Sequence, residues 1–191
     1  MTDGVVGRML VASLHQGIVD VHPARLEFYE GWLNPAGLRD GRIGLAPLAA
    51  VLSFLRQEGE PYDRVAGRAG EYTAEWTVLG LTPFHRAALR QAPPSLRARL
   101  ALRVARSMVH ATSRSTRTVV RWRQGQATMD LRGSIFCDVR ERTAHPLCAY
   151  YASAIRHLLA RFDLDADVTT EQCRATGGGH CVMSIRLRTG T

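Results

Sequence analysis

Hydrophobic residues recur at intervals of three or four positions from residue 5 to residue 112, with polar residues between them. This period is typical of amphipathic α-helices, which turn one side toward a core. Proline and glycine residues interrupt the pattern and mark the expected helix ends. The sequence predicts helices over 5–21, 24–33, 45–55, 62–78, 84–91 and 96–112.

The period changes to two at Arg117, where hydrophobic and polar residues begin to alternate. Alternation on both sides of Gly125 predicts a β-hairpin. Helices followed by a mostly antiparallel sheet with one apolar face predict an α+β fold, with helices packed on that face. Beyond the hairpin we expect strands over 133–139, 167–173 and 181–187 and one inserted helix over 147–162.

The composition fits a folded protein with a sizeable core, since hydrophobic residues make up 46% of the 191 residues. The longest nearly unbroken apolar run, 45–54, is far shorter than the roughly 20 residues that span a bilayer. The N-terminus lacks the pattern of a signal peptide. We therefore expect a cytoplasmic protein without a membrane segment.

The formal net charge is +8, and every one of the 25 basic residues is an arginine. These arginines are scattered through helices and loops and form no continuous run, which favours a solvated basic surface over a nucleic-acid-binding one. The absence of lysine excludes Schiff-base chemistry and a P-loop lysine.

All four cysteines lie in the last third of the chain, from Cys137 to Cys181. A reducing compartment favours thiols or metal ligands over disulfides. Thiolates are suited to zinc, which binds four ligands in a tetrahedron. The alternative is that these are ordinary buried cysteines. As zinc ligands we expect Cys148, Cys173 and Cys181, with a fourth donor from Glu171, His180, His145 or Cys137.

The segments GSIFCDV, PLCAYYASAIRHLLARF and VTTEQCRATGGGHCVMSI make the last part of the chain similar to the 4-vinyl reductase domain family. The resemblance extends over about residues 95–187 and is most specific in its last 50 positions. It implies an α+β fold like that of the TRAPP subunits, with a hydrophobic pocket between helices and sheet. On this basis we divide the chain into a helical N-terminal segment, 1–80, and a ligand-binding domain, 81–191, that together form one compact unit.

Members of this family include bacteriochlorophyll 4-vinyl reductase accessory proteins and phenol-sensing domains. In the sensor branch, a glutamate and three cysteines bind zinc beside the ligand, and by position the cysteines correspond to Cys148, Cys173 and Cys181. The family's acidic residue corresponds to Thr170, whereas this chain carries its acid at Glu171. A zinc ion with a full set of protein ligands would be structural, because no coordination position stays open for a substrate.

An aromatic or tetrapyrrole-like ligand requires a pocket of apolar and aromatic side chains with a few polar groups. His110 is the polar candidate, since its imidazole can bind a phenol hydroxyl group or a tetrapyrrole metal. Each candidate also fits a role in core packing alone. The expected pocket residues are His110, Trp122, Phe136, Tyr150, Tyr151 and Met108, with Trp76 beside them.

The sequence contains no motif for a flavin, a nicotinamide cofactor or a hydrolase nucleophile. We therefore expect a carrier, accessory or sensor protein for a small hydrophobic molecule and assign no catalytic residue. A vinyl reductase of bacteriochlorophyll synthesis would need an external reductant. A third hypothesis is a dimeric interaction scaffold. We expect a homodimer that passes any signal to a protein partner.

Overall fold

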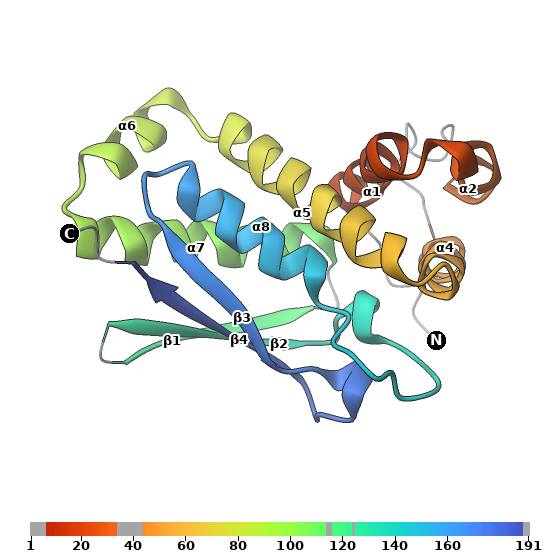
Figure 1. The fold of residues 1–191 in the computed structure, drawn as a ribbon. Helices are drawn as coiled ribbons and strands as arrows, with labels where there is room; N and C mark the ends of the chain where they lie inside the picture. Colours follow the sequence, from red (N-terminus) through yellow and green to blue (C-terminus); the bar gives the residue numbers. More distant parts are fainter. Residues whose placement is uncertain (1–6, 34–43, 114–115, 124, 189–191) are drawn as a thin grey trace.

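The computed structural model describes residues 7–33, 44–113, 116–123 and 125–188 (Figure 1). The sequence also predicts a polar loop over 38–44, and all of it except residue 44 lies outside the described residues. The described helices are α1 (Arg8–Val21), α2 (Leu26–Leu33), α4 (Leu45–Gln57), α5 (Glu60–Gly80), α6 (Pro83–Gln91), α7 (Pro94–Thr112) and α8 (Ala149–Ala160). Short 3-10 helices are η1 (Pro23–Arg25), η2 (Ile135–Cys137) and η3 (Arg174–Thr176).

The helices follow the periodicity of the sequence, and local signals determine where they begin. Thr82 caps α6, since its side-chain oxygen accepts a hydrogen bond from the backbone N–H of His85 at 3.2 Å. Helix α7 starts at Pro94, slightly before the expected start at residue 96, because a proline in the first turn gives up no helical hydrogen bond.

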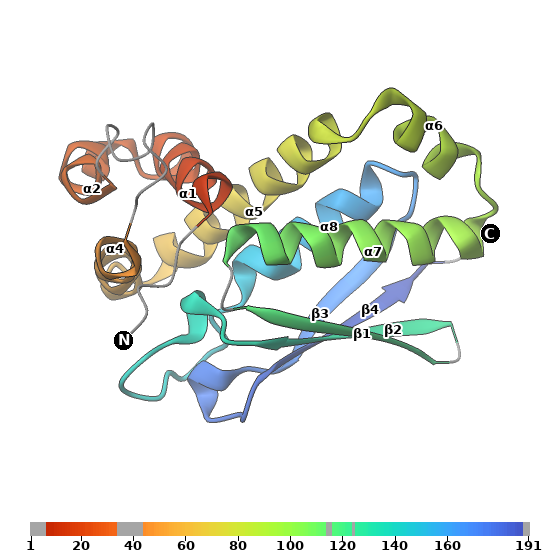
Figure 2. The same ribbon diagram turned by 180° about the vertical axis from the view of Figure 1, so that it is seen from behind.

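The sheet has four antiparallel strands, β1 (Arg117–Arg123), β2 (Gln126–Arg132), β3 (Ala166–Gln172) and β4 (Cys181–Leu187), in the order β1-β2-β4-β3. Helices α7 and α8 lie on one face of the sheet, and no described helix covers the other face (Figures 1 and 2). The expected α+β fold, with a helical N-terminal part and helices on one face of an antiparallel sheet, is confirmed.

The expected strand over 133–139 is wrong. Strand β2 ends at Arg132, and Gly133 adopts a φ of 73°, which turns the chain out of the strand. The 3-10 helix η2 follows and buries both Phe136 and Cys137 completely. A strand could not bury these neighbours on one face, because adjacent side chains of a strand point to opposite faces.

Helix α5 packs between α1 and α8 and joins the N-terminal helices to the layer that covers the sheet (Figure 1). The approach to α8 is close at Gly70, where an added Cβ would lie 2.2 Å from the carbonyl oxygen of Tyr150. One continuous hydrophobic core extends from α1 to the sheet. No described helix combines the length and apolar character that crossing a bilayer requires.

Candidate metal centre and the adjoining aromatic cluster

Four buried cysteine side chains meet where β2 ends and β4 begins. The sulfur atoms of Cys137, Cys148, Cys173 and Cys181 all lie within 4.8 Å of one another. The distance from Cys137 Sγ to Cys148 Sγ is 3.3 Å, and Cys173 Sγ lies 3.5 Å from each of these atoms. All four cysteines are free thiols in this arrangement.

Each cysteine comes from a different local structure at this end of the sheet. Cys137 closes η2, Cys148 immediately precedes α8, Cys173 lies between β3 and η3, and Cys181 is the first residue of β4. Each of these positions lies at the end of a helix or strand or directly beside one. The cysteine group therefore joins the turn between the paired strands β3 and β4 to the segments that carry Cys137 and Cys148.

Backbone hydrogen bonds hold the glycine turn between Cys173 and Cys181. The carbonyl oxygen of Cys173 accepts hydrogen bonds from the N–H groups of Thr176 and Gly178, at 3.2 and 2.9 Å. Gly177 has a φ of 103°, a conformation that favours glycine. The turn reverses the direction of the chain and places the sulfur atoms of Cys173 and Cys181 near each other.

Two further contacts fix the other cysteine-bearing segments. The N–H of Thr143 donates to the carbonyl oxygen of Ala175 at 2.8 Å, which ties the loop before α8 to η3. The buried hydroxyl group of Tyr62, on α5, donates to the carbonyl oxygen of Leu147 at 3.0 Å and positions the residue before Cys148. The positions of the cysteine side chains thus depend on α5 as well as on the sheet.

The electrostatics divide the thiols into two kinds. Hydrogen bonds from Cys137 and Cys148, together with one from the backbone N–H of Arg174, lower the pKa of Cys181 to about 4. Hydrogen bonds from the same two thiols also lower the pKa of Cys173. Hydrogen bonds to Cys137 and Cys173 raise the pKa of Cys148. Donors therefore surround Cys173 and Cys181 and favour their thiolate forms.

This donor set fits a soft divalent metal. A tetrahedral zinc site with bonds of about 2.3 Å separates its sulfur atoms by about 3.8 Å, close to the separations found here. Four buried thiolates would repel one another strongly without a cation between them. Four protein ligands would complete the coordination shell, which gives the ion a structural role.

The structure brings Cys137 into the group and leaves Glu171, one of the expected fourth donors, outside it. Glu171 is exposed and accepts a hydrogen bond from Thr169 at 3.2 Å. Regular alternation along a strand would place Glu171 on the same face as Cys173, but a bulge between Thr170 and Gln172 interrupts the alternation of β3.

The two histidine candidates also lie apart from the cysteine group. His180 Nε2 lies 3.6 Å from the Oδ2 atom of the buried Asp130, on the other face of the sheet. His145 is exposed in the loop before α8. Of the proposed fourth donors, only Cys137 places its ligand atom in the group.

Three of the expected pocket residues form a compact aromatic cluster beside the cysteines. The rings of Phe136 and Tyr150 are stacked at a centroid distance of 4.4 Å, and Tyr151 meets both edge-on, at 5.4 and 5.2 Å. All three residues are fully buried. Phe136 directly precedes Cys137, and Tyr150 follows two residues after Cys148, so the aromatic cluster is attached to the cysteine group.

The hydroxyl groups of Tyr150 and Tyr151 differ in their hydrogen bonding. The hydroxyl group of Tyr150 lies 2.6 Å from Thr73 Oγ1, whereas that of Tyr151 has no hydrogen-bond partner among the described residues. The hydroxyl group of Ser134 is likewise buried without a partner in this part of the chain. Burial raises the pKa of Tyr151 to about 12, so its hydroxyl group stays protonated.

Two of the three hydroxyl groups near Tyr151 already donate to backbone carbonyl oxygens. The side chains of Thr112, Thr116 and Ser134 lie close to it. Thr112 donates to a backbone carbonyl oxygen at 2.7 Å, and Thr116 donates to another at 3.2 Å. Tyr151 and Ser134 therefore have unused hydrogen-bonding capacity in the core.

The remaining candidates lie outside the aromatic cluster. Met108 is buried on α7, and His110 is half-buried near the end of the same helix. Trp122 is half-buried on β1 and lines a shallow cavity of about 230 Å³ with arginines of α7. Trp76 stacks obliquely on Tyr72 of α5, at 5.5 Å. The structure does not gather these residues around one cavity.

No protein-family model and no curated protein matches this sequence. Solved structures do match the fold. The phenol-responsive sensory domain of the transcription activator PoxR, with phenol, is 13% identical at a TM-score of 0.52, over 77% of this chain and 78% of that one. An unliganded Fe(II) H-NOX protein from K. algicida is 11% identical at 0.57, over 96% and 97%.

A trafficking protein particle complex subunit 3 from Naegleria fowleri, covalently bound to palmitic acid, is 14% identical at a TM-score of 0.50. The match covers 94% of this chain and 96% of that chain. These similarities establish the fold, and they agree with the TRAPP-like architecture expected from the sequence.

Proposed function

We propose that this chain is a small-molecule-binding sensor domain of the 4-vinyl reductase type, with one structural zinc ion held by Cys137, Cys148, Cys173 and Cys181. The observation that carries the proposal is the attachment of the cysteine group to an aromatic cluster in which the buried hydroxyl group of Tyr151 has no partner among the described residues. The fold neighbours support it, since a phenol-responsive domain and H-NOX proteins share this architecture.

The ligand in this proposal is a small aromatic molecule that carries a hydroxyl group. Its ring would be accommodated among Phe136, Tyr150 and Tyr151, and its hydroxyl group would pair with those of Tyr151 and Ser134. The aromatic cluster is closely packed, so binding requires Phe136 to move with η2. Because η2 ends at Cys137, the zinc ion limits this movement and links ligand occupancy to the loop that follows.

The first test is the metal content of protein purified without added metal. We expect about one zinc ion per chain, and a marked loss of zinc in Cys137→Ser as well as in Cys173→Ser. Glu171→Gln is the matched control and should retain zinc, because Glu171 lies outside the cysteine group. Zinc loss in Glu171→Gln with retention in Cys137→Ser would refute the four-cysteine site.

The second test is calorimetric titration of the zinc-loaded protein with phenol, and with toluene as the ligand without a hydroxyl group. We expect saturable phenol binding at one site and weaker toluene binding. Tyr151→Phe should weaken phenol binding by up to about tenfold, the value of one neutral hydrogen bond. Phenol binding that fails to saturate would overturn the sensor proposal and leave zinc as a purely structural feature.

The expected homodimer and protein partner also belong to this proposal. Sedimentation velocity with and without phenol, together with the phenol titration, separates a sensor from the alternative of a scaffold. A scaffold forms the same oligomer in both conditions and shows no saturable phenol binding, whereas a sensor with a protein partner binds phenol whatever its oligomeric state.

A further inference from the structure

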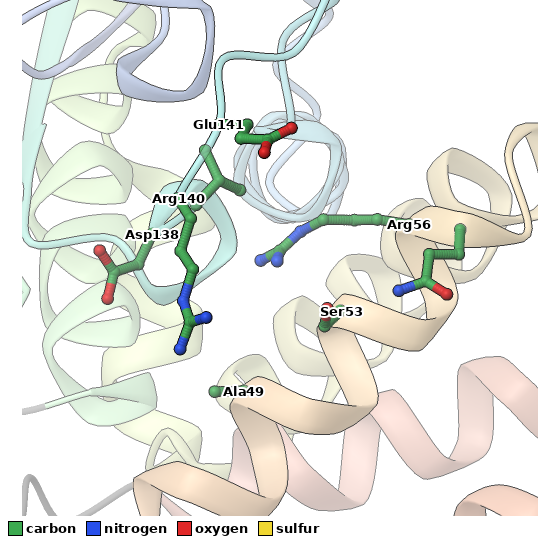
Figure 3. Close-up of a pocket in the computed structure, with 8 residues that line it drawn as sticks. Ala49, Ser53, Arg56, Asp138, Arg140 and Glu141 are labelled. Carbon is green, nitrogen blue, oxygen red and sulfur yellow. The ribbon is translucent and has the colours of Figure 1, made fainter.

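A separate cavity of about 590 Å³ lies between α4 and the segment that follows Cys137 (Figure 3). Its volume falls within the range of about 300–1,000 Å³ that is typical of small-molecule sites. One wall is a single face of α4, because Ala49, Ser53 and Arg56 are spaced by one helical turn. The other wall is the loop that carries Asp138 and Arg140.

Two guanidinium groups point into this cavity from opposite walls, that of Arg56 from α4 and that of Arg140 from the loop (Figure 3). Neither arginine forms an ion pair with a carboxylate in the described part of the chain. Like charges that share a cavity repel each other, and a bound anion offsets this repulsion.

Contacts with the backbone hold Arg56 in place. Its terminal Nη2 atom donates to the carbonyl oxygens of Ile135 and Phe136, at 3.4 and 3.0 Å. Its Nε atom is buried and has no partner among the described residues. These contacts fix the orientation of the guanidinium group. A ligand oxygen in the cavity would bind the terminal N–H donors that they leave unused, since the buried Nε atom is out of reach.

The acidic residues of the cavity offset this charge only in part. Asp138 forms an ion pair with Arg174 at 3.1 Å. Glu141 lines the cavity without an ion pair to Arg56 or Arg140 within the described segments. Ser53 supplies a hydroxyl group beside the arginines and can donate to a bound oxygen (Figure 3).

We propose that this cavity binds the carboxylate or phosphate group of a small molecule between Arg56 and Arg140. The site is separate from the aromatic cluster and does not depend on phenol binding. Anion binding draws the loop toward α4 and stabilises the segment that begins at Cys137.

The experiment is calorimetric titration at fixed ionic strength with inorganic phosphate, with benzoate, and with benzamide as the neutral match of benzoate. We expect saturable binding of at least one anion and none of benzamide. Arg140→Ala should weaken anion binding by about tenfold or more, because it removes a charge-assisted hydrogen bond. Arg140 is exposed, so its replacement leaves the core intact. Arg123→Ala, an equal charge change on β1, should leave binding unchanged.

Two further variants separate the site from general charge attraction and from misfolding. Ala49→Phe fills the cavity from an exposed position of α4 and should abolish binding with both arginines retained. Glu141→Gln should tighten anion binding about two- to fivefold, because it removes a like charge. Absence of saturable anion binding, equal affinity for benzamide, or equal losses in Arg140→Ala and Arg123→Ala would overturn the proposal.

Discussion

The helical half of the molecule, α1 to α5, and its cysteine end, residues 133–148 and 173–181, reach a buried state by different routes. In the helical half, regular helices satisfy the backbone internally, and small residues permit close packing. An added Cβ on Gly17 of α1 would lie 2.7 Å from the carbonyl oxygen of Val65 on α5. At the cysteine end the backbone is irregular and four thiols meet. The difference indicates that segments with little regular structure need a cross-link to stay buried, whereas regular helices stay buried through close packing alone.

Removal of the proposed zinc ion should give the largest effect and should affect the cysteine end much more than the helical half. Metal binding contributes about 4 kcal/mol when the free metal exceeds its Kd about 1,000-fold. We expect chelation to remove hydrogen-exchange protection from the cysteine end, while α1 keeps its protection. Chelator added to the metal-free Cys173→Ser protein should change nothing further. Equal loss of protection in both regions would contradict the division.

Gly70→Ala tests the close contact between α5 and α8, which connects the two regions. The new Cβ would approach the carbonyl oxygen of Tyr150 to 2.2 Å and force the helices apart. We expect a loss of about 3 kcal/mol in the free energy of unfolding, measured by urea denaturation. Gly67→Ala on the same helix is the control. Its Cβ would lie 3.9 Å from Ser153, so this change should be neutral or stabilise by up to about 1 kcal/mol. Equal effects of the two substitutions would contradict the contact.

The neighbouring tyrosines provide a smaller and paired test. Tyr150→Phe removes the hydrogen bond with Thr73 and should cost about 1–2 kcal/mol in the free energy of unfolding. Tyr151→Phe removes a hydroxyl group that has no partner in the described structure, so stability should stay the same or rise. Urea denaturation of both variants without ligand measures the difference. A larger loss for Tyr151→Phe would show that its hydroxyl group is satisfied in solution.

The smallest effect concerns a polar contact on the surface of the helical half. Hydrogen bonds from Tyr72 and Arg68 lower the pKa of Asp20 from its ordinary value of 3.8. The carboxylate therefore stabilises the fold at pH above this value, and the contribution is lost as the pH falls through the lowered pKa. We expect Asp20→Asn to cost less than about 1 kcal/mol at pH 7 and nothing at the acid limit. Thermal unfolding of the two proteins at several pH values measures the difference in their stability. A difference that does not change with pH would contradict this assignment.

The sequence predicted the regular elements well, because periodicity records which side of a helix or strand is buried. Every described α-helix lies close to an expected one, and strand β4 has the expected bounds. The site was harder to predict, because two local irregularities decide it. The turn at Gly133 replaces a strand and carries Cys137 inward, and the bulge at Glu171 turns that residue outward. Periodicity assumes regular geometry and cannot record either change.

The aromatic cluster could be predicted from the sequence only in part. The residue types at Phe136, Tyr150 and Tyr151 indicated burial, and the structure buries all three together. Their separation from Trp122 and His110 depends on how α7 and α8 lie across the sheet. That arrangement is a property of tertiary packing, for which the sequence pattern contains no direct signal.

The strand order carries a consequence for the way this chain is made. Strand β4 is synthesised after the other three described strands, yet it lies between β2 and β3. During translation, β2 and β3 therefore leave the ribosome without the neighbour that joins them, and the fourth thiol emerges only with Cys181. Closure of the sheet and assembly of the four thiols, with capture of the proposed zinc ion, are consequently late events that coincide, and a nascent chain exposes strand edges and reactive thiols until that moment.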